Sequence, residues 1–125
     1  MPENTIASRI IDAAYQVHST LGPGLFESVY EEALAYELTL NQSKVEQQKP
    51  IPIRYRDKFF DRGFIADLIV DDTVVVELKS VEKVAPVHKK QLLTYLRLSD
   101  KRLGLLINFG ETSLKDGISR VVNGL

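Results

Sequence analysis

Two carboxylates and an amine stand close together near the middle of the chain. Asp67 lies in the segment FIADLIV, and Glu77 and Lys79 lie in the later segment VVVELKS. Alternate side chains of an extended strand point to the same face, so Glu77 and Lys79 share one side of their strand. Carboxylate oxygens are preferred ligands of Mg²⁺ and Mn²⁺, and a nearby lysine can stabilise charge that develops on a phosphate. These residue types suit phosphoryl chemistry at a divalent ion.

The connection between the two strands decides whether Asp67 joins Glu77. If the turn contains only Asp71 and Asp72, Asp67 lies opposite Val76 and each face mixes charge with aliphatic carbon. If the turn or a bulge holds one more residue, Asp67 lies opposite Glu77 and one face becomes entirely apolar. That face would hold Ala66, Leu68, Val70, Val74, Val76 and Leu78, and the other would hold Ile65, Asp67, Ile69, Val75, Glu77 and Lys79. Burial favours the second register, in which the acids and the lysine converge.

Carboxylates placed opposite each other on neighbouring strands repel, so a positive charge is needed to offset the repulsion. One interpretation is a surface ion-pair trio in which Lys79 supplies that charge. The other interpretation is a divalent ion, because partly desolvated carboxylates need a strong counter-charge. Mg²⁺ or Mn²⁺ also keeps waters that can attack a phosphate. The spacing alone leaves both interpretations open.

Helices and strands alternate around this hairpin. Apolar residues at helical spacing predict helices over residues 5–20, 26–40 and 87–98. Asn4 or Thr5 can cap the first of these helices. A period of two predicts strands over 45–48, 51–55, 64–70 and 73–79, the second confined by Pro50 and Pro52 to an edge or a strand start. An apolar strand is expected over 103–109, and a short helix or strand within 113–123. This order predicts one α/β domain over residues 1–125, with helices covering a sheet.

Composition is that of an ordinary globular protein. The chain has 125 residues, of which 44% are hydrophobic and 26% charged, and it has no cysteine. These values exclude a disordered, collagen-like or coiled-coil chain, and the lack of cysteine excludes disulfides and thiolate metal sites. No apolar run is long enough to span a membrane, and the first residues lack the apolar centre of a secretory signal. We therefore expect a cytoplasmic protein.

Charge gives no overall attraction for nucleic acid. The formal net charge is −1, so a nucleic acid would have to meet a local basic patch. Basic residues gather in two segments, the first with Arg54, Arg56 and Lys58 and the second with His88, Lys89, Lys90, Arg97, Lys101 and Arg102. Each segment is either a solvated face or a set of phosphate contacts.

Three motifs together resemble a known superfamily. Asp67 followed by Glu77-Leu78-Lys79 resembles the D…(D/E)-x-K signature of the PD-(D/E)XK nucleases, with Ala66 where the superfamily's name has proline. The segment QLLTY, from Gln91 to Tyr95, is similar to the Q-x-x-x-Y motif of the RecB-like branch. The segment GLFESVY, residues 24–30, is similar to the G-x-x-E-x-x-Y signature of the GxxExxY family, small prokaryotic proteins of this superfamily. The resemblance covers nearly the whole chain.

The resemblance implies a restriction-endonuclease-like αβββαβ core with a mixed central sheet flanked by helices. It implies Asp67, Glu77 and Glu27 as ligands of Mg²⁺ or Mn²⁺, with Asp67, Glu77 and Lys79 in the catalytic centre. Gln91 and Tyr95 would support that centre from their helix. Without the resemblance, Glu27 suits the positive N-terminal end of its own helix, so both roles stay open for it.

Two functions from different classes follow. The first is a metal-dependent nuclease that hydrolyses DNA or RNA, with the acids holding the ion and Lys79 stabilising the developing charge. The second is a catalytically silent binding or regulatory module that retains the nuclease fold, as a homodimer or an accessory subunit. The small size and near-neutral charge favour this alternative, because little chain remains to form a surface that reads nucleic acid.

Overall fold

A sheet of five strands, in the order β1-β2-β3-β4-β5, forms the centre of the computed structural model, which describes residues 2–125. In chain order the elements are α1 (Pro2–Leu21), α2 (Glu27–Leu40), β1 (Val45–Tyr55), β2 (Lys58–Val70), β3 (Val74–Lys79), α3 (Pro86–Ser99), β4 (Leu103–Asn108), the 3₁₀ turn η1 (Leu114–Gly117) and β5 (Ile118–Val122). Strands β3 and β4 are parallel, and all other neighbours are antiparallel. The predicted mixed sheet with flanking helices is confirmed.

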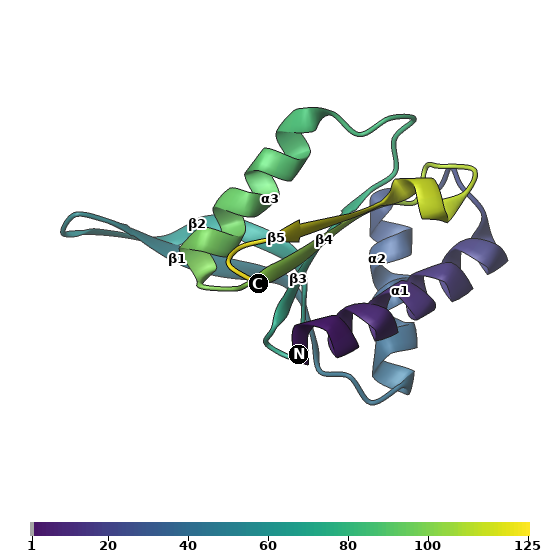
Figure 1. Ribbon diagram of the computed structural model, residues 1–125, viewed down its shortest axis with the longest axis horizontal. Helices are drawn as coiled ribbons and strands as arrows, with labels where there is room; N and C mark the ends of the chain where they lie inside the picture. Colours follow the sequence, from purple (N-terminus) through teal and green to yellow (C-terminus); the bar gives the residue numbers. More distant parts are fainter. Residues whose placement is uncertain (1) are drawn as a thin grey trace.

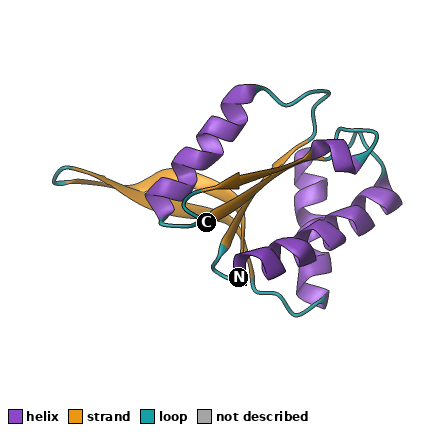
Figure 2. Cartoon of the chain, in the orientation of Figure 1, coloured by secondary structure: helices purple, strands orange, loops and turns teal. Residues whose placement is uncertain are grey.

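The helices cover both faces of the sheet (Figures 1 and 2). Helices α1 and α2 pack on one face, where their apolar sides meet Leu68, Val76 and Leu105 in the larger core cluster. Helix α3 packs on the other face through Leu92 and Leu96. No helix within residues 2–125 has the length and apolar character needed to cross a membrane.

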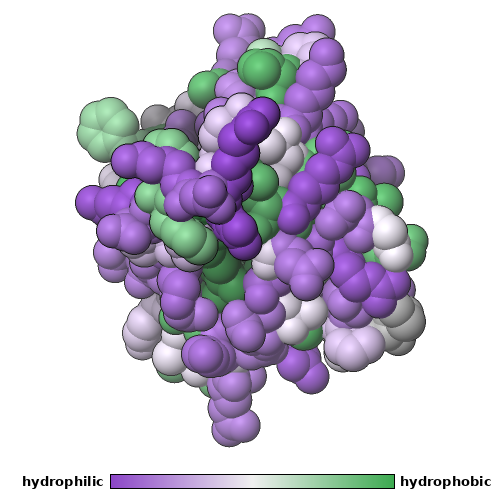
Figure 3. Space-filling model, turned by 90° about the vertical axis from the view of Figure 1, so that its left-hand side faces the viewer, coloured by the Kyte–Doolittle hydropathy of each residue, from purple (hydrophilic) through white to green (hydrophobic). Residues whose placement is uncertain are grey.

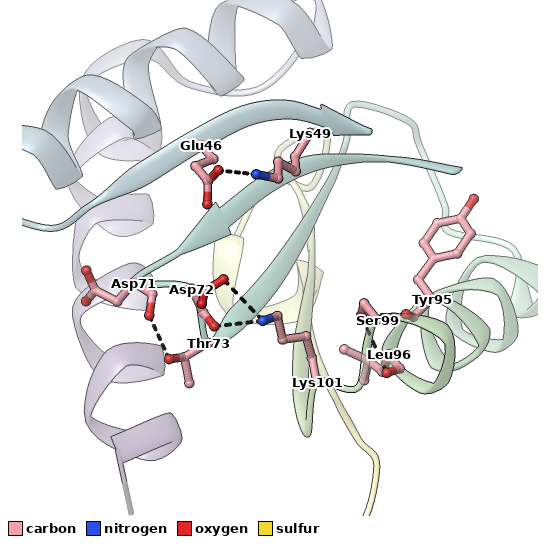
Figure 4. Close-up of polar contacts among 9 residues, drawn as sticks. All are labelled: Glu46, Lys49, Asp71, Asp72, Thr73, Tyr95, Leu96, Ser99 and Lys101. Atoms are coloured by element: carbon pink, nitrogen blue, oxygen red, sulfur yellow. Dashed lines mark hydrogen bonds and ion pairs between the residues drawn. The ribbon is translucent and has the colours of Figure 1, made fainter. Parts of the chain in front are cut away.

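The turn between β2 and β3 contains Asp71, Asp72 and Thr73, so Leu68 pairs with Val76. Both aspartates have positive φ angles, 51° and 53°, a conformation that aspartate tolerates better than most residues. The Lys101 ammonium donates to the carbonyl and the carboxylate of Asp72 at 2.9 and 3.2 Å (Figure 4). The longer turn gives the register predicted from burial, and Lys101, which lies just before β4, holds the turn through its hydrogen bonds to Asp72.

Strands β1 and β2 are longer than predicted. The two strands expected over 45–48 and 51–55 are one strand, and β2 begins at Lys58 rather than at residue 64. Continuous pairing explains both differences, because Tyr55 pairs with Lys58 across a tight turn. Pro50 and Pro52 are tolerated within β1 because it is an edge strand, where a missing amide breaks no second ladder.

Helix α1 starts earlier than predicted, at Pro2, which places Asn4 and Thr5 inside the helix instead of at its cap. The side chain of Asn4 instead accepts a hydrogen bond from the Arg120 guanidinium of β5. A tertiary contact to the far end of the chain, invisible in the local sequence, therefore takes the place of the expected cap.

Ala66 lies on the opposite face from the predicted one. It packs beneath α3 in the same cluster as Ile69 and Val75, away from Leu68. The alternation of β2 is broken beside Asp67, where the β1–β2 ladder lacks a Gln48–Asp67 pair and Gln48 has a φ of 47°. The prediction assumed an unbroken strand, and this irregularity resets the side-chain alternation next to Asp67.

Candidate active site

Asp67 and Glu77 are joined through the backbone at the point where β2 and β3 separate. The ladder between these strands ends at Leu68 and Val76. Beyond it, the amide of Asp67 donates to Glu77 Oε2 at 2.8 Å, and the amide of Leu78 donates to Asp67 Oδ2 at 2.9 Å. Each carboxylate therefore takes the place of a ladder carbonyl, and the predicted convergence of the two acids is present.

Two features on either side hold the strands apart. Strand β3 stays paired with β4 as far as Lys79 and Asn108, so it cannot follow β2. On the β1 side, Gln48 adopts a left-handed conformation, which costs a non-glycine residue about 1–3 kcal/mol. The side-chain nitrogen Nε2 of Gln48 donates to Asp67 Oδ1 at 3.3 Å and to Glu31 Oε1 at 2.5 Å. The side chain of Gln48 thus links a carboxylate of α2 to the Asp67 side chain.

The environment of Glu77 disfavours a negative charge. Burial raises its pKa from the ordinary 4.5 to about 8, and the charge of Asp67 adds to the rise. The amide of Asp67 and the charge of Lys79 lower the pKa but do not cancel these effects. An ionised Glu77 beside Asp67 is therefore stable only if a further positive charge approaches it.

Lys79 lies on the same strand face as Glu77 and is half-buried. Within residues 2–125, the ion pairs closer than 4.0 Å do not include Lys79. The surface ion-pair trio considered from the sequence is therefore not formed, and the ammonium is available for another negative group.

Tyr95 reaches the same side of the sheet from α3. Its ring stacks on Phe64 with a centroid distance of 4.0 Å and an interplanar angle of 2°. Burial raises the pKa of Tyr95, and the charges of Glu77 and then Asp67 add to the rise, so the hydroxyl senses both acids. Gln91 lies one helical turn earlier on α3 and is exposed, and no hydrogen bond among residues 2–125 ties its side chain to the acids.

The resemblance led us to expect a third acidic ligand, Glu27, from α2. Glu27 is exposed in the first turn of α2. Among residues 2–125 there is no group of three or more acidic, histidine or cysteine side chains placed to hold a metal ion. Glu27 therefore does not complete a preformed three-acid cluster with Asp67 and Glu77.

Glu31 and Gln48 are site neighbours that sequence reasoning missed. The carboxylate of Glu31 accepts from Gln47 at 3.1 Å and from Gln48 at 2.5 Å, and its charge contributes to the raised pKa of Glu77. The available signal was spacing, because Glu31 follows Glu27 by one helical turn and shares its face. No comparable signal identifies Gln48, whose role depends on an irregular strand.

The G-x-x-E-x-x-Y segment builds the entry to α2. The buried Tyr30 hydroxyl donates to the Gly22 carbonyl at 2.5 Å and accepts from the Leu25 amide at 3.1 Å. Its ring stacks on Phe109 at 4.5 Å. The Ser80 hydroxyl donates to the Leu25 carbonyl at 2.5 Å, so this loop is fixed to the residue directly after Lys79.

Asn108 anchors the same strand end from β4. It is fully buried and pairs with Lys79 in the parallel ladder. Its oxygen accepts from the amides of Val81 and Gly110, both at 3.0 Å, and its nitrogen donates to the Val81 carbonyl at 2.9 Å. Every polar atom of this side chain is satisfied, so Asn108 fixes the backbone that follows Lys79.

We compared the chain with models of known protein families. A model of the PD-(D/E)XK nuclease superfamily matches residues 4–121, nearly the full chain. The chain belongs to this superfamily, and the restriction-endonuclease-like fold predicted from the sequence is confirmed. Searches of the curated proteins and of the solved structures gave no significant match.

Proposed function

We propose that the protein is a nuclease that hydrolyses phosphodiester bonds of DNA or RNA with the help of Mg²⁺ or Mn²⁺. The main support is the pair of amide hydrogen bonds that holds Asp67 and Glu77 together where β2 and β3 separate. Lys79, which forms no ion pair with any residue from 2 to 125, lies on the same strand face. Superfamily membership supports the same function.

The chemistry of the donor set fits a hard divalent cation. Among residues 2–125, Glu77 Oε1 has no hydrogen-bond partner, and Asp67 Oδ1 has only the long bond from Gln48 at 3.3 Å. These oxygens are the ligand type that Mg²⁺ and Mn²⁺ prefer. The raised pKa of Glu77 points the same way, because burial and the charge of Asp67 outweigh the charge of Lys79, and a bound cation would offset them. Asp67 and Glu77 would hold the ion, with waters or substrate oxygens completing its shell.

A bound Mg²⁺ or Mn²⁺ would supply Lewis acidity at the scissile phosphate and lower the pKa of a water. The protein residues supply position and charge. Asp67 and Glu77 are fixed by backbone amides, so they lose little freedom when they bind. The ammonium of Lys79 donates to a phosphate oxygen or to the attacking water, and it stabilises negative charge in the transition state.

Residues on the helices support this centre. Tyr95, held by its stack on Phe64, would orient a substrate oxygen through its hydroxyl, and Gln91 would contact the substrate from the preceding turn of α3. Glu27 stays a predicted third ligand, and it would act through a water or after a side-chain rotation. Lys89, Lys90 and Arg97, together with the basic segment 54–58, would contact phosphates.

Several finer assignments belong to the same proposal. We place the protein in the GxxExxY family and the RecB-like branch, on the segments GLFESVY and QLLTY. A prokaryotic source, a cytoplasmic location and assembly as a homodimer remain predictions. Each concerns the setting of the site and not its chemistry.

A nuclease assay tests the proposal. Single- and double-stranded DNA and RNA are incubated with Mn²⁺, Mg²⁺ or EDTA and with wild type, Lys79→Ala or the control Lys115→Ala. Lys115 is exposed on η1 and is not one of the predicted site residues, so its replacement removes the same charge from another part of the chain. We expect cleavage that needs the metal and is lost only in Lys79→Ala. Equal cleavage by all three proteins would assign the activity to a contaminant, and no cleavage by wild type would favour the silent binding module.

A further inference from the structure

The distal end of the β1–β2 hairpin extends beyond the helices (Figure 1). We call residues 53–62 the hairpin arm. Its tip is the turn at Arg56 and Asp57, between the paired residues Tyr55 and Lys58. Three aromatic rings on the arm are exposed, Tyr55 by 64%, Phe59 by 67% and Phe60 by 43%. This exposure needs an explanation, because a short two-stranded ribbon gains no core from solvated rings.

A basic side chain lies over each of these rings. The Arg54 guanidinium is 5.6 Å from the Phe59 centroid, and the Arg56 guanidinium is 5.8 Å from the Tyr55 centroid. The Lys58 ammonium is 5.8 Å from the Phe60 centroid. Such contacts bring positive charge to one face of a ring, and each of these residues stays exposed to solvent. Viewed from the side on which the arm projects, apolar and hydrophilic side chains intermingle over the surface (Figure 3).

The cross-strand pairs place rings on both faces of the arm. Arg54 lies opposite Phe59 on one face, and Tyr55 lies opposite Lys58 on the other, because adjacent pairs alternate. The arm therefore presents a ring and a cation together on each side.

The net charge of the arm differs in sign from that of the whole chain. Residues 53–62 contain four basic and two acidic side chains, which gives a local net charge of +2, whereas the whole chain carries −1. The remainder of the protein therefore carries a net charge of −3. A nucleic acid that approaches the protein would be attracted to the arm.

We propose that the hairpin arm binds a single-stranded stretch of nucleic acid that passes around the arm, with one unpaired base stacked on Tyr55 on one face and another on Phe59 on the opposite face. Arg54, Arg56 and Lys58 contact the adjoining phosphates. Exposed rings next to cations are the combination that single-strand binding uses, because every unpaired base offers a π-face and every nucleotide a phosphate. The bases of a duplex are already stacked on one another and offer no such face. This inference rests on the proposed function and extends it to the form of the substrate.

The distance between the arm and the acids determines how much of a strand lies between them. Phe59 precedes Asp67 by eight residues on β2, which corresponds to about 26 Å at about 3.3 Å per residue. At the duplex rise of about 3.4 Å per nucleotide this span corresponds to about seven or eight nucleotides, and an extended single strand covers it with fewer.

Fluorescence anisotropy with labelled oligo-dT, oligo-U and a duplex of about 20 nucleotides, longer than most single-strand site sizes, tests the inference. The titrations are made in EDTA, so that binding does not depend on a metal at the acids. The variants are Tyr55→Ala, Phe59→Ala and Phe59→Leu, which keeps apolar bulk but removes the ring. The matched control is Tyr36→Ala on α2, which removes a ring that is 66% exposed far along the chain from the arm.

Removal of each stacked ring is expected to weaken single-strand binding about 5- to 150-fold. Phe59→Leu should lose as much as Phe59→Ala, Tyr36→Ala should lose nothing, and all melting temperatures should match wild type because the rings are exposed. Comparison of the affinities for oligo-dT and oligo-U shows whether the protein prefers DNA or RNA.

Three results would overturn the inference: single-strand affinity that is unchanged in both arm variants, equal losses on duplex and single strand, or wild type that binds no oligonucleotide. The last result would make the arm a contact for another protein. Cleavage and binding measured on the same wild-type protein separate this inference from the proposed function. Arm-dependent binding by wild type without any cleavage would contradict the nuclease proposal alone.

Discussion

The carboxylate of Glu77 accepts a hydrogen bond from the backbone amide of Asp67 at 2.8 Å. The carboxylate of Asp67 in turn accepts one from the amide of Leu78, the residue after Glu77. The acids are thus positioned by the backbone at the fork between β2 and β3, and no basic side chain among residues 2–125 lies within 4.0 Å of them. Such a pair is held in place before any ion binds, which is a requirement for an efficient metal site.

The stability of the metal-free protein should fall as the pH rises through the range in which Glu77 loses its proton. The folded-state pKa of Glu77 is raised to about 8 from an ordinary 4.5, so between these values the folded protein holds a proton that the unfolded chain has released. Stability from this group is therefore greatest below the lower value and declines up to the upper one. The whole decline should not exceed about 5 kcal/mol, at about 1.4 kcal/mol per pKa unit. Urea unfolding in EDTA across this range measures it.

Glu77→Gln is the matched variant for this pH dependence. Glutamine resembles the protonated acid and keeps an oxygen that can accept from the Asp67 amide, so the variant should be at least as stable as wild type at pH 8, with a flatter profile. A profile as steep as that of wild type would show that another group causes the decline.

Asn108→Leu should destabilise the fold. Leucine keeps the branched shape of asparagine, although it is somewhat larger, and it leaves the amides of Val81 and Gly110 and the Val81 carbonyl without partners. A buried unsatisfied group costs about 1–3 kcal/mol, so a loss of about 3 kcal/mol or more is expected in urea unfolding. The control, Asn41→Leu, changes an exposed residue and should stay near wild type. A loss below about 1 kcal/mol for Asn108→Leu would refute the anchoring role.

Gly110 packs against backbone atoms, whereas Gly104 packs against a side chain, so alanine should be tolerated differently at the two positions. A Cβ at position 110 would lie 2.2 Å from the Val81 carbonyl oxygen, whereas at position 104 its nearest contact is the Leu92 side chain at 2.9 Å. Backbone cannot move aside as a leucine tip can, so Gly110→Ala should cost about 3 kcal/mol and Gly104→Ala less. Melting temperatures measured side by side rank the two variants, and the reverse order would contradict the packing described after Lys79.

Much of this arrangement could be predicted because burial fixes it. Val70, Val74, Val76 and Leu78 must share an apolar face, and that requirement alone selected the register that unites Asp67 with Glu77. The position of Tyr95 followed from helical spacing and from the resemblance. These inferences depend on periodicity, which local sequence carries directly.

Other parts of the site depend on exceptions to periodicity. The left-handed Gln48 interrupts the ladder with Asp67, shifts Ala66 to the other face and brings Glu31 into the network. A glutamine gives no signal for that conformation, as a glycine would have done. The length of the hairpin arm was missed for a related reason, because its strands are solvated and show no apolar face.

Mn²⁺ binding measured by isothermal titration calorimetry tests the central claim, that Asp67 and Glu77 form one metal site. Wild type should bind the ion more tightly as the pH rises toward the Glu77 pKa of about 8, because binding must displace the proton from Glu77. Asp67→Asn and Glu77→Gln should each weaken binding by at least about tenfold, whereas the exposed control Glu82→Gln should not change it. Equal Mn²⁺ affinity in wild type and Glu77→Gln, or no binding by wild type at pH 8, would contradict the account.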